Sequence, residues 1–152
     1  MKHVISFLVV VMLYGCAADE VESFATSSDV VDEFMTAFNA HDIDAMLVHA
    51  DEDIRWMSIT GDQLVTETSG QQQLREMLAE YFENIPSTQS AIMASERGGP
   101  FIMTVERATW TGSDGEKKSS CSNAVYEIRD RVILNVWYIY PAYSCLRVWT
   151  GQ

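Results

Sequence analysis

The fold of this chain is decided by residues 38–56, which read FNAHDIDAMLVHADEDIRW. Asn39-Ala40-His41 interrupts a helical pattern, and Asp42 has the short acceptor side chain that caps a helix N-terminus. A short second helix is expected to follow, and Asp51-Glu52-Asp53 is expected to end it. Residues 54–59 then favour a strand. The stretch therefore predicts a helix, a turn, a short helix and a strand in close succession.

A strong amphipathic helix is predicted on the N-terminal side of this stretch. Ser28 is expected to cap it, and Asp29 in its first turn complements the helix dipole. Its apolar residues recur at the spacings that place side chains on one buried helix face. These residues are Val30, Val31, Phe34, Met35 and Phe38.

On the C-terminal side, a third helix gives way to strands. Ser69-Gly70-Gln71-Gln72 fits a capping box, and the helix after it is expected to end before Pro86. The apolar period then changes to two, and Ser113-Asp114-Gly115 is a hairpin signal. Helices on one side of a bent antiparallel sheet make an α+β domain with a concave interior. We expect strands at residues 88–95, 101–111, 117–129 and 132–140.

Composition and charge agree with a single globular domain. The chain has 152 residues, of which 47% are hydrophobic and 21% charged, and its formal net charge is −12. A chain of this length buries enough surface to hold a core without a metal. Its few, scattered Lys and Arg residues argue against nucleic acid, because binding to a phosphate backbone depends on clustered cations. The expected partners are therefore small, neutral or cationic.

The N-terminus predicts export. Residues 1–15 read MKHVISFLVVVMLYG, with a cation at Lys2 followed by an apolar run, which is typical of a secretory signal peptide. Leu13-Tyr14-Gly15-Cys16 resembles a bacterial lipobox and predicts lipidation of Cys16; ordinary secretion is the alternative. Ala17 follows the cysteine, at the position where an Asp would indicate retention in the inner membrane, so the resemblance indicates the outer membrane. We expect an exported protein of the periplasm or cell envelope, an outer-membrane lipoprotein that touches the membrane only through its lipid.

Four segments are expected along the chain: a signal peptide at 1–15, a tether at 16–28, the folded domain at 29–141 and a C-terminal extension at 142–152. After processing, Cys121 and Cys145 remain in a compartment that permits disulfides. A disulfide between them and two separate buried thiols are both compatible with the sequence.

Residues 38–45 and 50–56 resemble the opening of SnoaL-like domains in the nuclear transport factor 2-like (NTF2-like) superfamily. Gly70 with its helix, Val105-Glu106-Arg107 before a Gly-rich hairpin, and a final strand ending in aromatics follow in the same order. The resemblance covers residues 29–141. It implies a cone, in which a curved sheet wraps around the helices and encloses a pocket that often binds small apolar or amphipathic molecules.

The resemblance extends to the ketosteroid isomerases of this superfamily, whose catalytic positions carry unsuitable side chains here. Their general base falls on Ser58, and their oxyanion-stabilising tyrosine falls on Phe34. A serine hydroxyl has no useful proton affinity near neutral pH unless a base activates it, and phenylalanine has no donor. An isomerase reaction with the usual groups is therefore not expected.

The limonene-epoxide hydrolase pattern is matched little better. The residues that hold the attacking water fall on Trp56 and Ser58, and the two catalytic aspartates fall on Thr109 and Trp137. Only the arginine is matched, by Arg107. The resemblance thus implies a pocket face without the usual acid and base, formed by Phe34, Trp56, Ser58, Arg107, Thr109 and Trp137.

These pocket residues allow two interpretations. The aromatic side chains suit an apolar ligand, but they equally suit the filling of a core. Arg107 would offer paired donors to an acidic ligand, or it would pair with an acidic neighbour such as Glu127, or point outward.

The expected function is that of a secreted, lipid-anchored domain that binds a small apolar or weakly acidic molecule in its cone. One alternative is an enzyme of hydrolase, isomerase or cyclase type that uses Arg107 with Glu127 or Tyr138. Another is a non-catalytic envelope module that acts as a homodimer, with an aromatic face at Tyr138, Tyr140, Tyr143 and Trp149. Whether the protein is an enzyme stays open.

No metal and no cofactor are expected. His41 and His49 do not have the spacing of metal ligands relative to a cysteine or to each other. Asp51-Glu52-Asp53 lacks the glycine and the spaced oxygens of a calcium loop.

Overall fold

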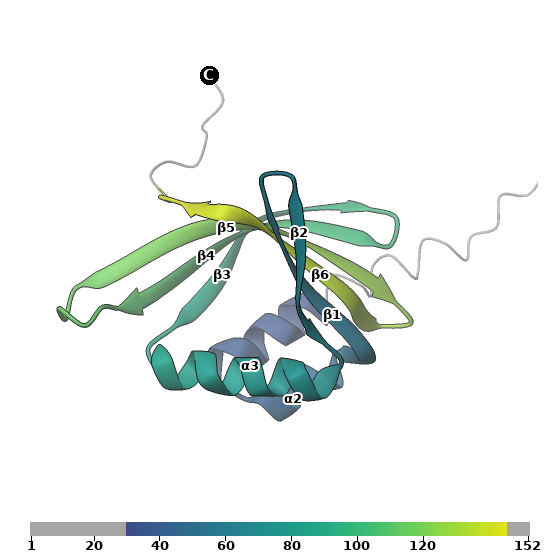
Figure 1. Ribbon diagram of the computed structural model, residues 1–152, viewed down its shortest axis with the longest axis horizontal. Coiled ribbons are helices and arrows are strands. Elements are labelled where there is room, and N and C mark those ends of the chain that lie inside the picture. The colour runs from purple at the N-terminus through teal and green to yellow at the C-terminus, as the bar shows by residue number, and fades with distance from the viewer. Residues whose placement is uncertain (1–29, 146–152) are drawn as a thin grey trace, which may run out of the picture.

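The computed structural model describes residues 30–145 (Figure 1). Ser28, the expected signal peptide, Cys16 and Trp149 lie outside the described residues. Helices lie under one face of a curved sheet, which arches over them (Figure 1). This is the α+β arrangement that the sequence predicts.

The helices follow the predicted pattern closely. The N-terminal helix runs through residues 30–39 and ends at a turn in which His41 has a φ of 55°. α2 (Ile43–Val48) follows at once, and the Asp42 carboxylate accepts a hydrogen bond of 3.0 Å from the Ala45 N–H, which confirms the predicted N-cap. α3 (Gln71–Asn84) buries Leu74, Leu78 and Phe82 on one face. The helical periodicity was therefore a sound guide to these elements.

The start of α3 differs from the predicted capping box. Gly70 is the N-cap residue, with a φ of 84° and no side-chain cap. The Ser69 side chain does not cap the helix; instead, the Ser69 N–H donates to Oε1 of Gln73 at 3.0 Å. A glycine suits this position because other residues adopt a positive φ only at a cost. The prediction of a serine cap was therefore wrong, although the helix begins where expected.

The six strands form one sheet in the order β2-β1-β6-β5-β4-β3. β1 pairs in parallel with β6, and the other neighbours are antiparallel. Two expectations fail here. Residues 51–53 belong to β1 rather than to the end of a helix, and β2 was not predicted, because this edge strand buries only Thr68 and shows no apolar alternation. The strands are β1 (Ala50–Thr60), β2 (Gln63–Ser69), β3 (Gln89–Gly98), β4 (Phe101–Thr111), β5 (Lys117–Arg129) and β6 (Val132–Tyr143).

The core lies between the helices and the concave face of the sheet. Phe34, Met46 and Ile54 are fully buried there, as are Leu74 and Tyr126. Among residues 30–145, no helix combines the length and the apolar character needed to cross a bilayer. The sheet continues beyond this core, and the cavity described below lies against its concave face.

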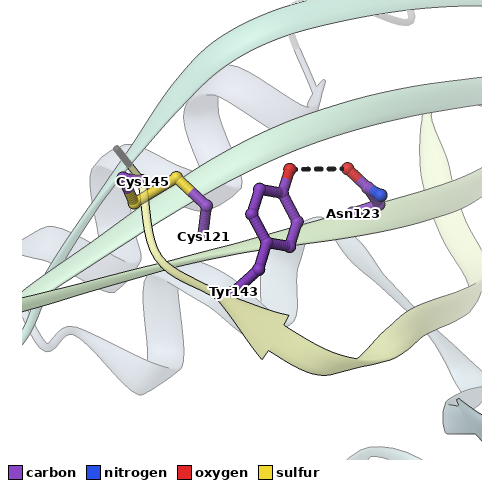
Figure 2. Close-up of a disulfide and its surroundings, with 4 residues drawn as sticks. All are labelled: Cys121, Asn123, Tyr143 and Cys145. Carbon is purple, nitrogen blue, oxygen red and sulfur yellow. Dashed lines mark hydrogen bonds between the residues drawn. A yellow bond between two sulfur atoms is a disulfide. The ribbon is translucent and has the colours of Figure 1, made fainter. Parts of the chain in front are cut away.

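A disulfide joins Cys121 on β5 to Cys145, just after the end of β6 (Figure 2). The two Cα atoms are 5.2 Å apart. Beside it, Tyr143 pairs with Cys121 across the two strands, and its hydroxyl donates to Oδ1 of Asn123 at 3.1 Å (Figure 2). Of the two alternatives left by the sequence, the bridged cysteines are the one the structure contains.

Candidate functional site

A cavity of about 330 Å³ lies between the helices and the concave face of the sheet. The N-terminal helix and α3 form one wall, and side chains from β1, β3, β4, β5 and β6 form the other. Aromatic and aliphatic groups dominate the lining. The lining includes Phe34, Trp56, Tyr81, Glu106, Tyr138 and Tyr140.

Among residues 30–145, Glu106 is the only charged residue that lines this cavity. Its side chain is buried, with 3% exposure. Oε1 accepts hydrogen bonds from Thr104 Oγ1 at 2.7 Å and from the Tyr126 hydroxyl at 2.6 Å, and Oε2 accepts one from the Tyr138 hydroxyl at 2.6 Å. These hydroxyl donors replace the water that the carboxylate loses on burial.

The two tyrosines that hold Glu106 have raised pKa values. Burial, followed by the negative charge of Glu106, raises the pKa of Tyr126 and of Tyr138 well above the ordinary value for tyrosine. Both hydroxyls therefore remain hydrogen-bond donors at neutral pH. Tyr138 lines the cavity, whereas Tyr126 lies wholly beneath it, so a ligand can meet Glu106 and Tyr138 together.

A row of aromatic rings forms part of the cavity wall. The rings of Trp56 and Tyr138 stack with centroids 5.1 Å apart, and Tyr140 stacks next to Tyr138 at 6.4 Å. The ring of Phe34 lies 6.3 Å from that of Trp56. Flat aromatic faces beside an open space suit a planar or cationic ligand.

A second, more open hollow of about 710 Å³ adjoins the cavity, and the two share Trp56, Met77 and Tyr140. It lies between α3 and the β1–β2 pair. Three carboxylate side chains line it, and burial together with the negative charge of Glu67 raises the pKa of Tyr140. These carboxylates belong to Glu67, Glu76 and Glu80.

The structure brings together only some of the residues predicted for the pocket. Phe34 and Trp56 line the cavity, although Phe34 is fully buried and belongs equally to the core. Ser58 lies in the adjoining hollow, where its hydroxyl donates to Oε1 of Glu67 at 2.5 Å. A role of these residues in ligand contact stays a prediction.

The other predicted pocket residues lie on the wrong face of the sheet. Arg107 is exposed, and neither Thr109 nor Trp137 lines the cavity. On β4 and β6 the expected pocket face was displaced by one residue, and such a displacement turns every side chain to the opposite side. Trp137 instead packs near Phe101, with the ring centroids 6.3 Å apart.

Arg107 does not make the predicted pair with Glu127. Instead, Glu127 accepts a hydrogen bond of 2.6 Å from Nδ2 of Asn135 and lies 3.4 Å from an Arg129 nitrogen. A catalytic pair of Arg107 with Glu127, or of Arg107 with Tyr138, is therefore not formed. The third option, an outward-pointing Arg107, is the one the structure contains.

The predicted aromatic face for a homodimer is also divided by the sheet. Tyr138 lines the cavity and is partly buried, whereas Tyr140 borders both the cavity and the open hollow and is 43% exposed. Tyr143 is exposed, and its hydroxyl bonds to Asn123. Of the described members of this cluster, Tyr138 therefore faces the interior of the cone, while Tyr140 and Tyr143 are exposed, and the homodimer stays a prediction.

Glu106, the side chain in the cavity lining that is best suited to accept a proton, was not identified from the sequence. Glu106 and Arg107 are neighbours on β4, so their side chains point to opposite faces of the sheet, and the sequence-based prediction assigned the cavity face to Arg107. Glu106 and Trp110 are both even-numbered residues of β4 and both line the cavity, but the alternation alone does not tell which face of the strand is buried. The pocket face expected from the sequence therefore left out a carboxylate that the structure places in the cavity.

The arrangement can perform two kinds of chemistry. Oε2 of Glu106, which accepts from the Tyr138 hydroxyl, is able to accept a further hydrogen bond or a proton from a ligand, and the Tyr138 hydroxyl is a hydrogen-bond donor close by. Within residues 30–145, no group of three or more His, Cys, Asp or Glu side chains is placed to hold a metal ion.

The fold and the cavity define a class of proteins, the cone-shaped α+β domains with the NTF2-like fold. Residues 31–135 match the model of the SnoaL-like domain. The chain therefore belongs to the SnoaL-like domain family, as its sequence indicates. No curated protein matches the chain significantly.

Solved structures share this fold at low sequence identity. TerC, co-crystallised with polyporic acid, aligns with a TM-score of 0.66 at 16% identity, over 76% of this chain and 92% of that one. An NTF2-like protein of unknown function from Burkholderia pseudomallei K96243 gives 0.63 at 15% identity, over 76% and 91%. Bal32a, from a soil-derived mobile gene cassette, gives 0.64 at 13% identity, over 75% and 88%. At these identities the likeness concerns the fold alone.

Proposed function

We propose that this protein binds a small, largely apolar molecule in its cone and holds one polar group of that molecule at Glu106 and Tyr138. The observation that carries this proposal is the open cavity of about 330 Å³ whose lining contains a single charged side chain. A mostly apolar cavity with one polar anchor is typical of small-molecule sites. The complex of TerC with polyporic acid supports the idea that this fold accommodates such ligands.

The proposal includes export and a lipid anchor at Cys16. The disulfide between Cys121 and Cys145 supports it, because such bonds persist in oxidising compartments outside the cytoplasm. Labelling of growing cells with a radioactive fatty acid tests the anchor. Incorporation into the wild-type protein and none into a Cys16→Ala variant is the expected result, and equal labelling of the two would contradict it.

Binding is tested with a neutral aromatic alcohol, naphthylmethanol, by thermal unfolding and by calorimetric titration. At a hundredfold excess over its dissociation constant, it is expected to stabilise the folded protein by about 2.7 kcal/mol. Ala108 lines the cavity, so an Ala108→Phe variant should fill the space and abolish binding. Thr109→Phe, the next residue, is the matched control because Thr109 does not line the cavity. Unchanged binding by Ala108→Phe would overturn the proposal.

A second candidate function, proton transfer, is favoured by the position of Glu106. Its carboxylate lines the cavity beside a tyrosine that stays protonated, and such a pair can take a proton from carbon next to a carbonyl and stabilise the resulting oxyanion. To test it, the protein is incubated with an aryl ketone in D₂O, and mass spectrometry measures the exchange of the α-hydrogens of the ketone for deuterium. Exchange of the α-hydrogens that Glu106→Gln abolishes would support catalysis, and exchange at the rate of buffer alone would exclude it for that ketone.

A further inference from the structure

All ionised groups that line the cavity and its adjoining hollow are negative. Glu106 lines the cavity, and Glu67, Glu76 and Glu80 line the hollow; in the part of the chain that the structure describes, no Lys, Arg or His lines either space. The basic residue of α3, Arg75, is directed elsewhere: its guanidinium lies 2.6 Å from Asp44. The field in these spaces therefore disfavours an anion and favours a cation.

From this charge distribution we infer that the ligand is a hydrophobic cation, an organic amine or quaternary ammonium compound with an apolar body. This inference rests on the proposed binding function and names the chemical class of its ligand. It replaces the weakly acidic molecule expected from the sequence, because that expectation depended on Arg107, and Arg107 is exposed on the other side of the sheet.

The aromatic wall supplies the second part of the recognition. Trp56, Tyr138 and Tyr140 present stacked rings to the cavity, and two of them, Trp56 and Tyr140, also face the acidic hollow. Aromatic faces attract ammonium groups through the negative charge of the ring face, most strongly where water is excluded. The apolar helix side of the cavity, which includes Phe34 and Phe38, would receive the uncharged part of the ligand.

Glu106 supplies the counter-ion. Its Oε1 is shared by two hydroxyl donors, but Oε2 accepts only from Tyr138, so this oxygen can accept a further hydrogen bond. A cation that enters a buried space loses its hydration, and a hydrogen-bonded carboxylate at the site offsets that loss. The carboxylates of the hollow raise the local concentration of cations on the approach to this position.

Three probes with the same aromatic body test the inference: naphthylmethylamine, naphthylmethanol and naphthoic acid, which are a cation, a neutral molecule and an anion at neutral pH. Calorimetric titration of the mature protein, residues 16–152, gives the affinities. The amine is expected to bind about tenfold more tightly than the alcohol, from a cation–π and ion-pair gain of about 1.4 kcal/mol, and the acid is expected to bind least.

Two sets of variants assign this preference to the named carboxylates. Glu106→Gln should lower the ratio of amine to alcohol affinity several-fold, because it removes the ion pair and leaves the cation–π contribution, while the alcohol still binds. Glu76→Gln with Glu80→Gln, at exposed positions of α3 where folding is not at risk, should weaken the amine by about twofold at low salt and leave the alcohol unchanged. Glu96→Gln, at an exposed position of β3 that lines neither space, is the control for net charge.

The outcomes separate the two proposals. Equal affinity for the amine and the alcohol, or tighter binding of the acid, would overturn the inferred ligand class and leave the binding function intact. Failure of all three probes to bind would overturn the binding function itself. A preference for the amine that is undiminished in Glu106→Gln and in the Glu76, Glu80 double variant would show that these carboxylates do not recognise it.

Discussion

Replacing Glu106 with alanine is expected to lower the free energy of unfolding by about 3 kcal/mol, because it leaves buried hydroxyl groups without an acceptor. Thr104 and Tyr126, with exposures of 3% and 0%, have no access to water in place of the carboxylate. Tyr138 loses less, since it borders the cavity and can turn toward water there. Urea denaturation monitored by circular dichroism measures the change, with the slope of the transition as a check on two-state behaviour.

Two variants make this experiment specific. In Glu106→Gln the amide oxygen can still accept from Thr104 and Tyr126, so the loss should be smaller, about 1 kcal/mol. Arg107→Ala, at the next residue, removes an exposed side chain and should change the stability by less than about 0.5 kcal/mol. A larger loss from Arg107→Ala than from Glu106→Ala would mean that β4 presents its other face to the core.

That comparison concerns the feature of β4 that its sequence leaves ambiguous. The inward residues include Ile102, Thr104 and Glu106, whereas Phe101 and Met103 point outward and are exposed. Both faces thus carry apolar groups, and each has one charged residue. A period of two gives the strand but not its inward side, because shifting it by one residue produces an equally plausible pattern.

The helical half of the molecule was predictable for the opposite reason. A helix with one apolar stripe has only one face that can be buried, so Phe34 and Leu74 could be assigned to the core from their spacing. The cap at Asp42 was also readable, because it depends on neighbouring residues in the chain. Glu106, Tyr126 and Tyr138 come from three different strands, and only the sheet register brings them together.

Loss of the disulfide between Cys121 and Cys145 is expected to lower the free energy of unfolding by about 3 kcal/mol, from the greater freedom of the unfolded chain. The cysteines are 24 residues apart in the sequence, and the loop they close contains the hairpin of β5 and β6. Urea denaturation of a Cys121→Ala, Cys145→Ala variant measures the loss. Tyr143→Phe, which removes only the hydrogen bond to Asn123 next to the bridge (Figure 2), should cost far less because that bond is exposed to solvent.

The Cys121→Ala, Cys145→Ala variant is also expected to bind its ligand less well, because the bridge holds a strand end that forms part of the cavity. Tyr138, Tyr140 and Ala142 line the cavity from β6, and Cys145 follows shortly after the last of them. Without the bridge, this end of β6 is free to separate from β5, so the aromatic wall is less well ordered before binding. The affinity for naphthylmethanol, measured by calorimetry well below the unfolding transition, should fall several-fold. An affinity equal to that of the wild type, together with the expected loss of stability, would mean that the bridge stabilises the fold without shaping the site.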